Sequence, residues 1–260
     1  MNYKTIIIVA GEPNSIFFEI YFKALKNYNF KNPLIIIGSQ NILLNQMKKF
    51  NFSMKVRLID TSKINNYLLD NKSINLIDVK YHQQKVFEKS SKKSNLYINN
   101  CFNVAIKLLK DGFTDSLING PINKKTFLNK KYLGITEYLA SNFDVKNTAM
   151  LIYNKKLSVC PVTTHLPLKM VSNKINANLI YNKIKLINSF YKKKFSIIPK
   201  IALLGLNPHC ESVLKYNEDE KILKPLIKKL KKYNMRVSGP YSADTIFLSE
   251  NRKKFNVIIG

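Results

Sequence analysis

Short apolar runs alternate along the chain with longer amphipathic segments. The runs at residues 5–9 and 33–38 are continuous, which is typical of strands that are buried on both faces of a sheet. Between such runs, apolar residues recur at helical spacing. The predicted strands are residues 5–9, 33–38, 55–60, 114–119, 148–153, 157–162, 200–204 and 256–259. The predicted helices are residues 15–27, 40–50, 99–111, 176–193 and 218–233. This alternation predicts an α/β fold.

Two stretches depart from the alternation. Residues 61–95 are polar, rich in Asn, Lys and Ser, and only weakly periodic, so we expect an irregular excursion there. The sequence ends at Gly260 on an apolar run, whereas natural C-termini are usually helical or polar. This ending predicts a domain that continues beyond Gly260.

The cysteine content and the first residues indicate a cytoplasmic protein. Cys101, Cys160 and Cys210 are widely spaced and form no Cys-x-x-Cys pair, which argues against a disulfide framework and a cysteine-built zinc site. The first apolar run is too short for the core of a signal peptide, and no stretch approaches the roughly 18 apolar residues of a membrane span. We therefore expect a cytoplasmic location and no membrane partner.

The formal net charge of +27 at pH 7 bears on the choice of partner. A polyanion such as nucleic acid is one explanation. However, the lysines are spread through the whole chain, and the only arginines are Arg57, Arg236 and Arg252, whereas base recognition favours Arg. Compositional drift therefore explains the charge better than a nucleic-acid partner does. A phosphorylated substrate would also be attracted by the positive field.

Two of the three histidines lie directly after predicted strands. His165 follows the strand at 157–162, and His209 follows the strand at 200–204. Ligands gather at the carboxyl ends of strands in α/β sheets, so the two imidazoles are candidates for binding one divalent metal. Such a site needs a third ligand, and two ordinary loop histidines remain the alternative. His82 lies in the polar stretch, where we expect it to be solvated.

Familiar nucleotide and nucleophile motifs are absent from the sequence, which contains no Gly-x-Gly-x-x-Gly, phosphate-binding loop or Gly-x-Ser-x-Gly. Two other residues are candidates from their context. Asp244, in Ser-Ala-Asp-Thr, is either a metal ligand, a partner of one, or a helix cap. Lys124, which follows Gly-Pro-Ile-Asn, is either an anion contact at a helix start or one more surface lysine.

Six segments together resemble one enzyme family. Among them are Gly-Pro-Ile-Asn-Lys, Gly-Ile-Thr-Glu-Tyr-Leu-Ala, Thr-Thr-His-Leu-Pro-Leu and Gly-Leu-Asn-Pro-His. The segments are residues 11–20, 120–124, 134–140, 163–168, 205–209 and 239–245. In this order they resemble the motifs of the 4-hydroxythreonine-4-phosphate dehydrogenase family of pyridoxal phosphate biosynthesis.

The resemblance implies an α/β fold like that of isocitrate and isopropylmalate dehydrogenases, with two subdomains around a cleft. It implies one family domain over residues 1–260, incomplete at its C-terminus, with approximate subdomains 1–130 and 131–260. It also implies a cytoplasmic homodimer that uses NAD or NADP without a Rossmann motif. A divalent metal, which could be Zn, Mg, Co or Mn, is held by three histidines in this family.

Individual roles follow from the matched positions. His165 and His209 match two metal ligands, and Asp244 matches an acidic residue near the metal, so these three are the predicted catalytic residues. Thr136 and Lys124 are predicted to bind the phosphorylated substrate. Asn207 is predicted to contact the cofactor.

The chain also departs from the family pattern. Ile135 stands where the family has a substrate-binding His, which removes a phosphate contact. The third metal-binding His belongs to a His-Asp-Gln motif that would follow Gly260 by a few residues, so we expect it beyond this sequence.

The implied reaction is NAD- and metal-dependent oxidation of 4-phosphohydroxy-L-threonine to a β-keto acid. That acid loses CO₂ to give 3-amino-2-oxopropyl phosphate in pyridoxine 5'-phosphate biosynthesis. One alternative is a dehydrogenase of a four-carbon acid-sugar phosphate, which Ile135 makes plausible. Another is a decayed, non-catalytic basic binding protein, whose binding would fall steeply with salt.

Overall fold

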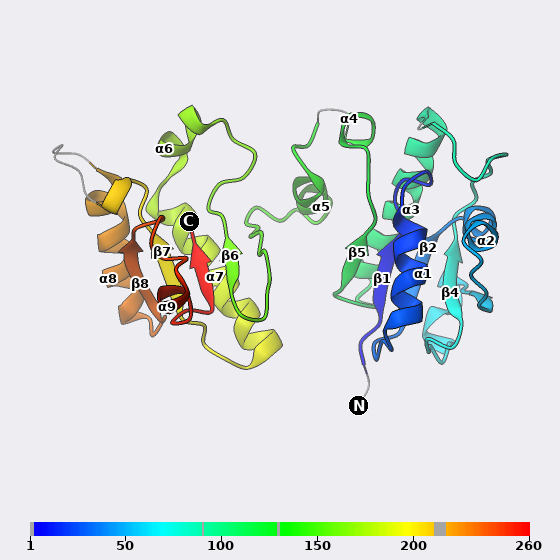
Figure 1. Cartoon of the computed structure of the whole chain (residues 1–260), viewed down its shortest axis with the longest axis horizontal. Helices are drawn as coiled ribbons and strands as arrows, with labels where there is room; N and C mark the ends of the chain where they lie inside the picture. The colour runs from blue at the N-terminus through cyan, green and yellow to red at the C-terminus, as the bar shows by residue number, and fades with distance from the viewer. Residues whose placement is uncertain (1–2, 90, 129–130, 211–216) are drawn as a thin grey trace. The chain divides into compact units, whose positions relative to one another are not determined.

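The computed structural model describes residues 3–89, 91–128, 131–210 and 217–260 of the chain. Its contacts divide it into two compact units, Met1–Tyr138 and Leu139–Gly260. Each unit is built on its own parallel sheet with helices against it (Figure 1). The predicted α/β class is therefore confirmed.

The first unit carries a sheet in the order β3-β4-β2-β1-β5. Its strands are β1 (Ile6–Val9), β2 (Leu34–Gly38), β3 (Val56–Leu58), β4 (Ile74–Asp78) and β5 (Leu117–Asn119). Its helices are α1 (Phe17–Asn27), α2 (Gln40–Lys49), the 3₁₀-helix η1 (Thr61–Asn66), α3 (Lys92–Lys110) and α4 (Lys124–Phe127). Helix α5 (Ile135–Asn142) crosses the boundary between the units.

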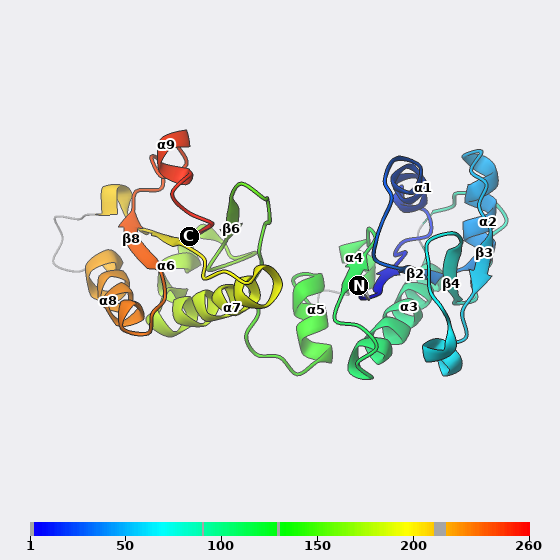
Figure 2. The same ribbon diagram turned by 90° about the horizontal axis from the view of Figure 1, so that it is seen from below.

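Helices cover both faces of this sheet. Figure 2 shows α1 and α2 on one face and α3 on the other. Ile8 and Ile36 pack with Phe22 of α1, while Ile7 and Ile35, which point to the opposite face, are also fully buried. Because both faces are covered, the central strands consist of continuous apolar runs, as the sequence predicted.

The prediction of an irregular excursion over residues 61–95 is wrong. Strand β4 lies within it and pairs with β2 on one side and β3 on the other. Its polar residue Asn75 is fully buried, and its side-chain amide donates to the carbonyl oxygens of Leu34 (3.0 Å) and Asp70 (2.7 Å). Asn75 interrupts the apolar run, so the pattern missed the strand. Helix α3 also begins earlier than predicted, after a cap by Ser91.

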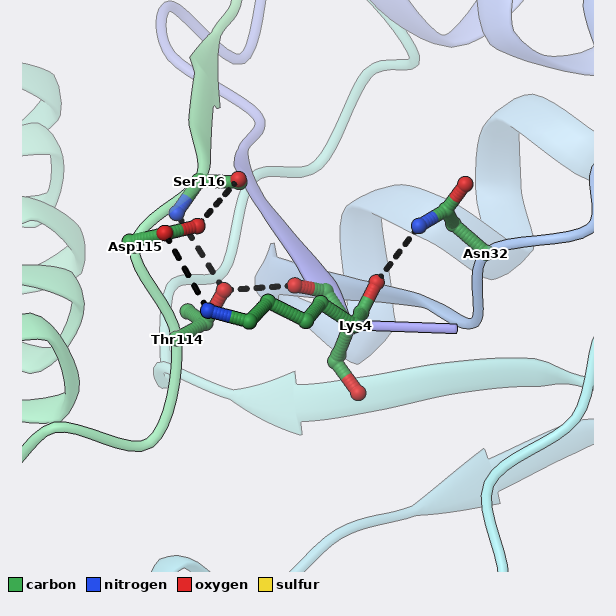
Figure 3. Close-up of polar contacts among 6 residues, drawn as sticks. Lys4, Asn32, Thr114, Asp115 and Ser116 are labelled. Atoms are coloured by element: carbon green, nitrogen blue, oxygen red, sulfur yellow. Dashed lines mark hydrogen bonds and ion pairs between the residues drawn. The ribbon is translucent and has the colours of Figure 1, made fainter. Parts of the chain in front are cut away.

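Hydrogen bonds tie the entry of β1 to the entry of its neighbour β5 (Figure 3). The Thr114 hydroxyl donates to the carbonyl oxygen of Thr5 at 2.5 Å, and the Lys4 ammonium lies 3.3 Å from the Asp115 carboxylate. On the other side, the Asn32 amide donates to the carbonyl oxygen of Lys4 at 2.7 Å. These contacts fix the register between β1 and β5, and with it the relative positions of their carboxyl ends.

The second unit carries a sheet in the order β6-β9-β7-β8. Its strands are β6 (Ser158–Cys160), β7 (Ile201–Leu204), β8 (Val237–Tyr241) and β9 (Val257–Ile259). Its α-helices are α6 (Val171–Lys174), α7 (Ala177–Phe195), α8 (Lys224–Lys232) and α9 (Ser249–Arg252). Shorter helical turns are η2 (Leu168–Met170), η3 (Pro208–Cys210) and the π-helical η4 (Asp219–Leu223).

Helices α7 and α8 cover one face of this second sheet, and α9 lies on the other (Figure 2). Ile184 of α7, Leu230 of α8 and Leu203 of β7 share the larger core. The expected strand pair at 148–153 and 157–162 reduces to β6 and one antiparallel bridge between Ile152 and Val159. Strand β8 was not predicted.

None of the helices in the described ranges is both long and apolar enough to cross a membrane.

A close backbone approach joins β1 and β5 at their carboxyl ends. A Cβ atom at Gly120 would overlap the carbonyl oxygen of Ala10, and it would come within 2.9 Å of the Phe17 ring. We predict that Gly120→Ala lowers the free energy of unfolding by about 3 kcal/mol, because overpacking of backbone has no flexible side chain to relieve it. Urea unfolding followed by circular dichroism measures this.

Gly112→Ala is the matched control. Gly112 has a positive φ of 75°, but a Cβ there meets nothing within 4 Å. The expected loss is therefore the conformational cost alone, about 1–2 kcal/mol. Equal losses for the two variants would contradict the overlap at Gly120.

Candidate functional site

The three predicted catalytic residues all lie at the carboxyl edge of the second sheet. The four strands are parallel, so they all end at the same edge. His165 follows β6, His209 follows β7 and Asp244 follows β8. Strand β9 lies between β6 and β7. Gly260, which follows β9, bonds to the end of β6, since the Val162 N–H donates to the Gly260 carbonyl oxygen at 2.6 Å. A residue placed after β9 would therefore leave the sheet between the two histidine-bearing loops.

Both histidines adopt left-handed backbone conformations. The φ angle is 58° at His165 and 56° at His209, and Cys210 follows with 61°. Such a conformation costs an ordinary residue about 1–2 kcal/mol. Backbone strain of this kind clusters at functional sites, where the surrounding structure holds it in place. Both side chains are exposed, so packing of the rings does not explain the conformations.

A hollow of about 300 Å³ lies at this edge. It is lined by Gly205, Leu206, Asn207, His209, Ser242, Ala243 and Asp244. The structure therefore brings three predicted residues, Asn207, His209 and Asp244, to one cavity. His165 lies at the same sheet edge but does not line this hollow.

Asp244 carries a stabilised negative charge beside His209. The Ser242 hydroxyl donates a hydrogen bond to the Asp244 carboxylate. This bond lowers the pKa of Asp244, and the nearby His209 imidazole lowers it further, while partial desolvation acts in the opposite direction. The carboxylate is thus held ionised at the mouth of the hollow.

Sequence reasoning missed Asp219, which organises the loop after β7. Its carboxylate is fully buried and accepts the backbone N–H groups of Leu206 (2.8 Å) and Asn207 (3.1 Å). The side-chain amide of Asn207 also donates to Asp219 (2.9 Å) and to Glu218 (3.1 Å). The only available signal was a run of three acids directly after an Asn in a chain with few carboxylates.

These bonds bear on the predicted cofactor contact. The amide nitrogen of Asn207 is already engaged by two carboxylates of its own chain. In this structure, Asn207 therefore shapes the loop, and its contact with a cofactor stays a prediction.

Burial, and then the Asp219 carboxylate, raise the pKa of the Cys210 thiol. We therefore expect Cys210 to be protonated and to pack without acting as a nucleophile.

The first unit contains the predicted substrate-binding residues. Lys124 is exposed and begins α4, and Thr136 is half-buried in the first turn of α5. Nearby, the first two family-like segments meet, since the N–H of Glu12 donates to the carbonyl oxygen of Pro121 at 2.8 Å. This contact lies at the carboxyl ends of the neighbouring strands β1 and β5.

The fit to a divalent metal rests on the donors at the second sheet's edge. Two imidazoles and one carboxylate suit zinc, cobalt or manganese. Within the described ranges, however, no three His, Cys, Asp or Glu side chains come close enough to hold an ion. The residues present thus fit part of a metal site.

The proteins that this chain resembles in sequence and in fold are dehydrogenases that act on a CH–OH group, and this protein is an enzyme of that class. The family described as "Pyridoxal phosphate biosynthetic protein PdxA" matches residues 29–260, and the chain belongs to this family.

The similarity to individual relatives extends over nearly the whole chain. A 4-hydroxythreonine-4-phosphate dehydrogenase of Sulfurihydrogenibium sp. (strain YO3AOP1) is 34% identical over 98% of this chain and 79% of its own length. A D-threonate 4-phosphate dehydrogenase of Salmonella typhimurium is 28% identical over 100% of this chain and 81% of its own. The structure of the Klebsiella pneumoniae 4-hydroxythreonine-4-phosphate dehydrogenase has a TM-score of 0.84 and 25% identity, and covers 99% of this chain and 81% of that one.

The hydrogen bond to Asp244 generates a pH-dependent prediction. Ser242→Ala removes the donor that favours the charged form, so the pKa of Asp244 should rise toward its usual value. In the native protein, the lowered pKa of Asp244 stabilises the folded state at pH values above the pKa that Asp244 has in the unfolded chain. This contribution is lost as the pH falls through the pKa of Asp244 in the folded state. Carboxyl ¹³C NMR titration measures the shift.

Asp60 provides the internal control, because the Ser62 hydroxyl and N–H lower its pKa in the same way. Ser242→Ala should leave the Asp60 titration unchanged. An unchanged Asp244 titration would show that Ser242 is not its donor in solution.

Proposed function

We propose that this protein oxidises 4-phosphohydroxy-L-threonine with NAD in pyridoxine 5'-phosphate biosynthesis, as a cytoplasmic homodimer. When bound, NAD would accept the hydride from the substrate carbon while the substrate hydroxyl releases its proton, which gives the ketone of a β-keto acid. That acid would then lose CO₂ and take up a proton to give 3-amino-2-oxopropyl phosphate. One observation carries the proposal: family-like loops bring His209 and Asp244 to one hollow, with His165 at the same sheet edge. Family membership supports it.

The residues of the second unit would act on the reacting end of the substrate. His165 and His209 would hold a divalent metal, which when bound supplies Lewis-acid stabilisation of the substrate oxygen. Asp244 keeps a negative charge beside His209, which favours a ring oriented for ligation. The exposed positions of both histidines leave their nitrogens accessible.

In the first unit, Thr136 and Lys124 are the proposed phosphate contacts. A hydroxyl and an ammonium are suitable donors to phosphate oxygens. Lys124 is exposed, so its ammonium group is accessible to a ligand.

A second substrate is favoured by two specific observations. A relative at 28% identity is named D-threonate 4-phosphate dehydrogenase, and this chain has Ile135 where the resemblance expects a phosphate-binding His. D-threonate 4-phosphate is a four-carbon acid-sugar phosphate with a hydroxyl for oxidation. It carries a hydroxyl where 4-phosphohydroxy-L-threonine carries the amine. The rates of NADH formation with the two substrates can therefore be compared in one assay.

The test is NADH formation by the protein expressed from its gene, with each substrate and with or without a chelator. We predict that His165→Ala and His209→Ala each lower kcat/KM by about 100-fold or more, since each removes a ligand that stabilises the transition state by several kcal/mol. A chelator should inhibit the unaltered protein to a similar degree.

His82→Ala is the control, because His82 is exposed in the first unit and has no proposed role. Its activity should match that of the unaltered protein. NADH formation that persists with a chelator and in both ligand variants would overturn the metal assignment. Preference for D-threonate 4-phosphate would replace the first substrate with the second.

Ile135 generates a separate prediction. Ile135→His introduces a donor at the first position of α5, next to Thr136. A hydrogen bond to a charged group contributes about 1.5–3 kcal/mol, so KM for the phosphorylated substrate should fall by about tenfold or more. Ile135→Val is the matched variant without a donor, and its KM should stay unchanged. An unchanged KM for Ile135→His would remove this position from the phosphate site.

A further inference from the structure

The first residue of η4, Asp219, is a buried carboxylate that is bonded to the loop directly after β7. Asp219 has no exposed surface, yet three N–H donors point at it, two from the backbone and one from a side chain. All three belong to Leu206 and Asn207, which lie just before His209. A buried carboxylate must have its oxygens satisfied, so Asp219 and this backbone segment determine each other's position.

A second contact fixes the beginning of the same loop. The N–H of Gly205 donates to the carbonyl oxygen of Tyr241 at 2.9 Å, which continues the pairing of β7 with β8. A Cβ at Gly205 would lie 3.0 Å from a carboxylate oxygen of Asp219 and 2.5 Å from the Cys210 sulfur. The loop is therefore packed tightly between the sheet and the Asp219 carboxylate, without room for a side chain at its first residue.

His209 follows the Leu206–Asn207 segment that Asp219 holds, and its backbone is strained. His209 and Cys210 both have positive φ, and the N–H of Cys210 donates to the carbonyl oxygen of Asn207 at 3.1 Å. The left-handed turn is thus closed onto Asn207, the residue that Asp219 holds through both its backbone and its side chain. Because the His209 side chain is exposed, burial of the ring does not explain the turn.

We infer that Asp219 is the positioning residue for His209. It acts through the Leu206–Asn207 backbone and sets the direction in which the imidazole leaves the sheet edge. The inference concerns the metal ligand of the proposed function, but the position of the His209 ring can be tested without metal.

The chain has three histidines, so its imidazole NMR signals are few enough to assign with single variants. The main variant is Asp219→Asn, which is isosteric but turns one acceptor oxygen into an NH₂ group that faces an N–H donor. The control is Glu220→Gln, which changes the adjacent, exposed carboxylate that pairs with Lys224 at the start of α8. Both variants are studied as the full chain, with a chelator and at one fixed pH.

We expect Asp219→Asn to shift the His209 imidazole signal and to leave the His82 and His165 signals in place. Zn²⁺ affinity, measured by calorimetry after the chelator is removed, should fall by about 10–100-fold, the usual effect of losing a group that orients a metal ligand. Glu220→Gln should change neither the signals nor the affinity. An unmoved His209 signal in folded Asp219→Asn would overturn the inference.

Asp219→Glu keeps the test decisive if Asp219→Asn does not fold. It retains the charge but moves the carboxylate by one methylene, so the His209 signal should shift in a folded protein, and an unshifted signal would refute positioning by Asp219. If the unaltered protein binds no Zn²⁺, the metal part of the proposed function fails. The chelator-treated NMR comparison still decides whether Asp219 positions His209.

Discussion

In the described part of both units, the strands of the main sheets pair in parallel, and this pairing constrains almost everything else. Each parallel strand needs a crossover that returns the chain to the same starting edge. The crossovers are helices, and they bury the sheet faces, so central strands such as β1 and β2 must be apolar on both sides. Polar chemistry is therefore confined to the ends of the strands, and the loops at one edge collect it.

The same constraint explains which elements could be predicted from the sequence. Strands β1 and β2 are unbroken apolar runs, and both were predicted within one residue of their ends. Strand β4 contains Asn75 and β8 contains Gly239-Pro240, which normally signals a turn. Neither interruption breaks its strand, because Asn75 finds two carbonyl acceptors and β8 lies at the edge of its sheet. Such compensation comes from tertiary contacts, which a local pattern does not contain.

The candidate site was predictable to a similar extent. His165 and His209 could be found because each follows a predicted strand, and parallel pairing brings such positions to one edge. Asp244 was found through its motif instead, because the strand before it, β8, was not predicted. Asp219 could not be found, because its role depends on bonds to residues twelve and thirteen positions earlier that form only in the folded loop. Asn207 shows a role that its motif did not reveal, since its amide nitrogen bonds to Asp219 and Glu218 in the folded loop. Its contact with a cofactor stays a prediction.

The energetic cost of the site is concentrated after β7. Left-handed backbone at His209 and Cys210 costs about 1–2 kcal/mol each, and a buried charge costs more unless it is fully hydrogen-bonded. One set of hydrogen bonds, between Asp219 and the Leu206–Asn207 segment, offsets both costs. The donors that satisfy Asp219 belong to the segment whose position makes the left-handed turn possible, so the buried charge and the strained histidine depend on the same bonds. Asp219 thereby links the interior of the second unit to the backbone that carries His209.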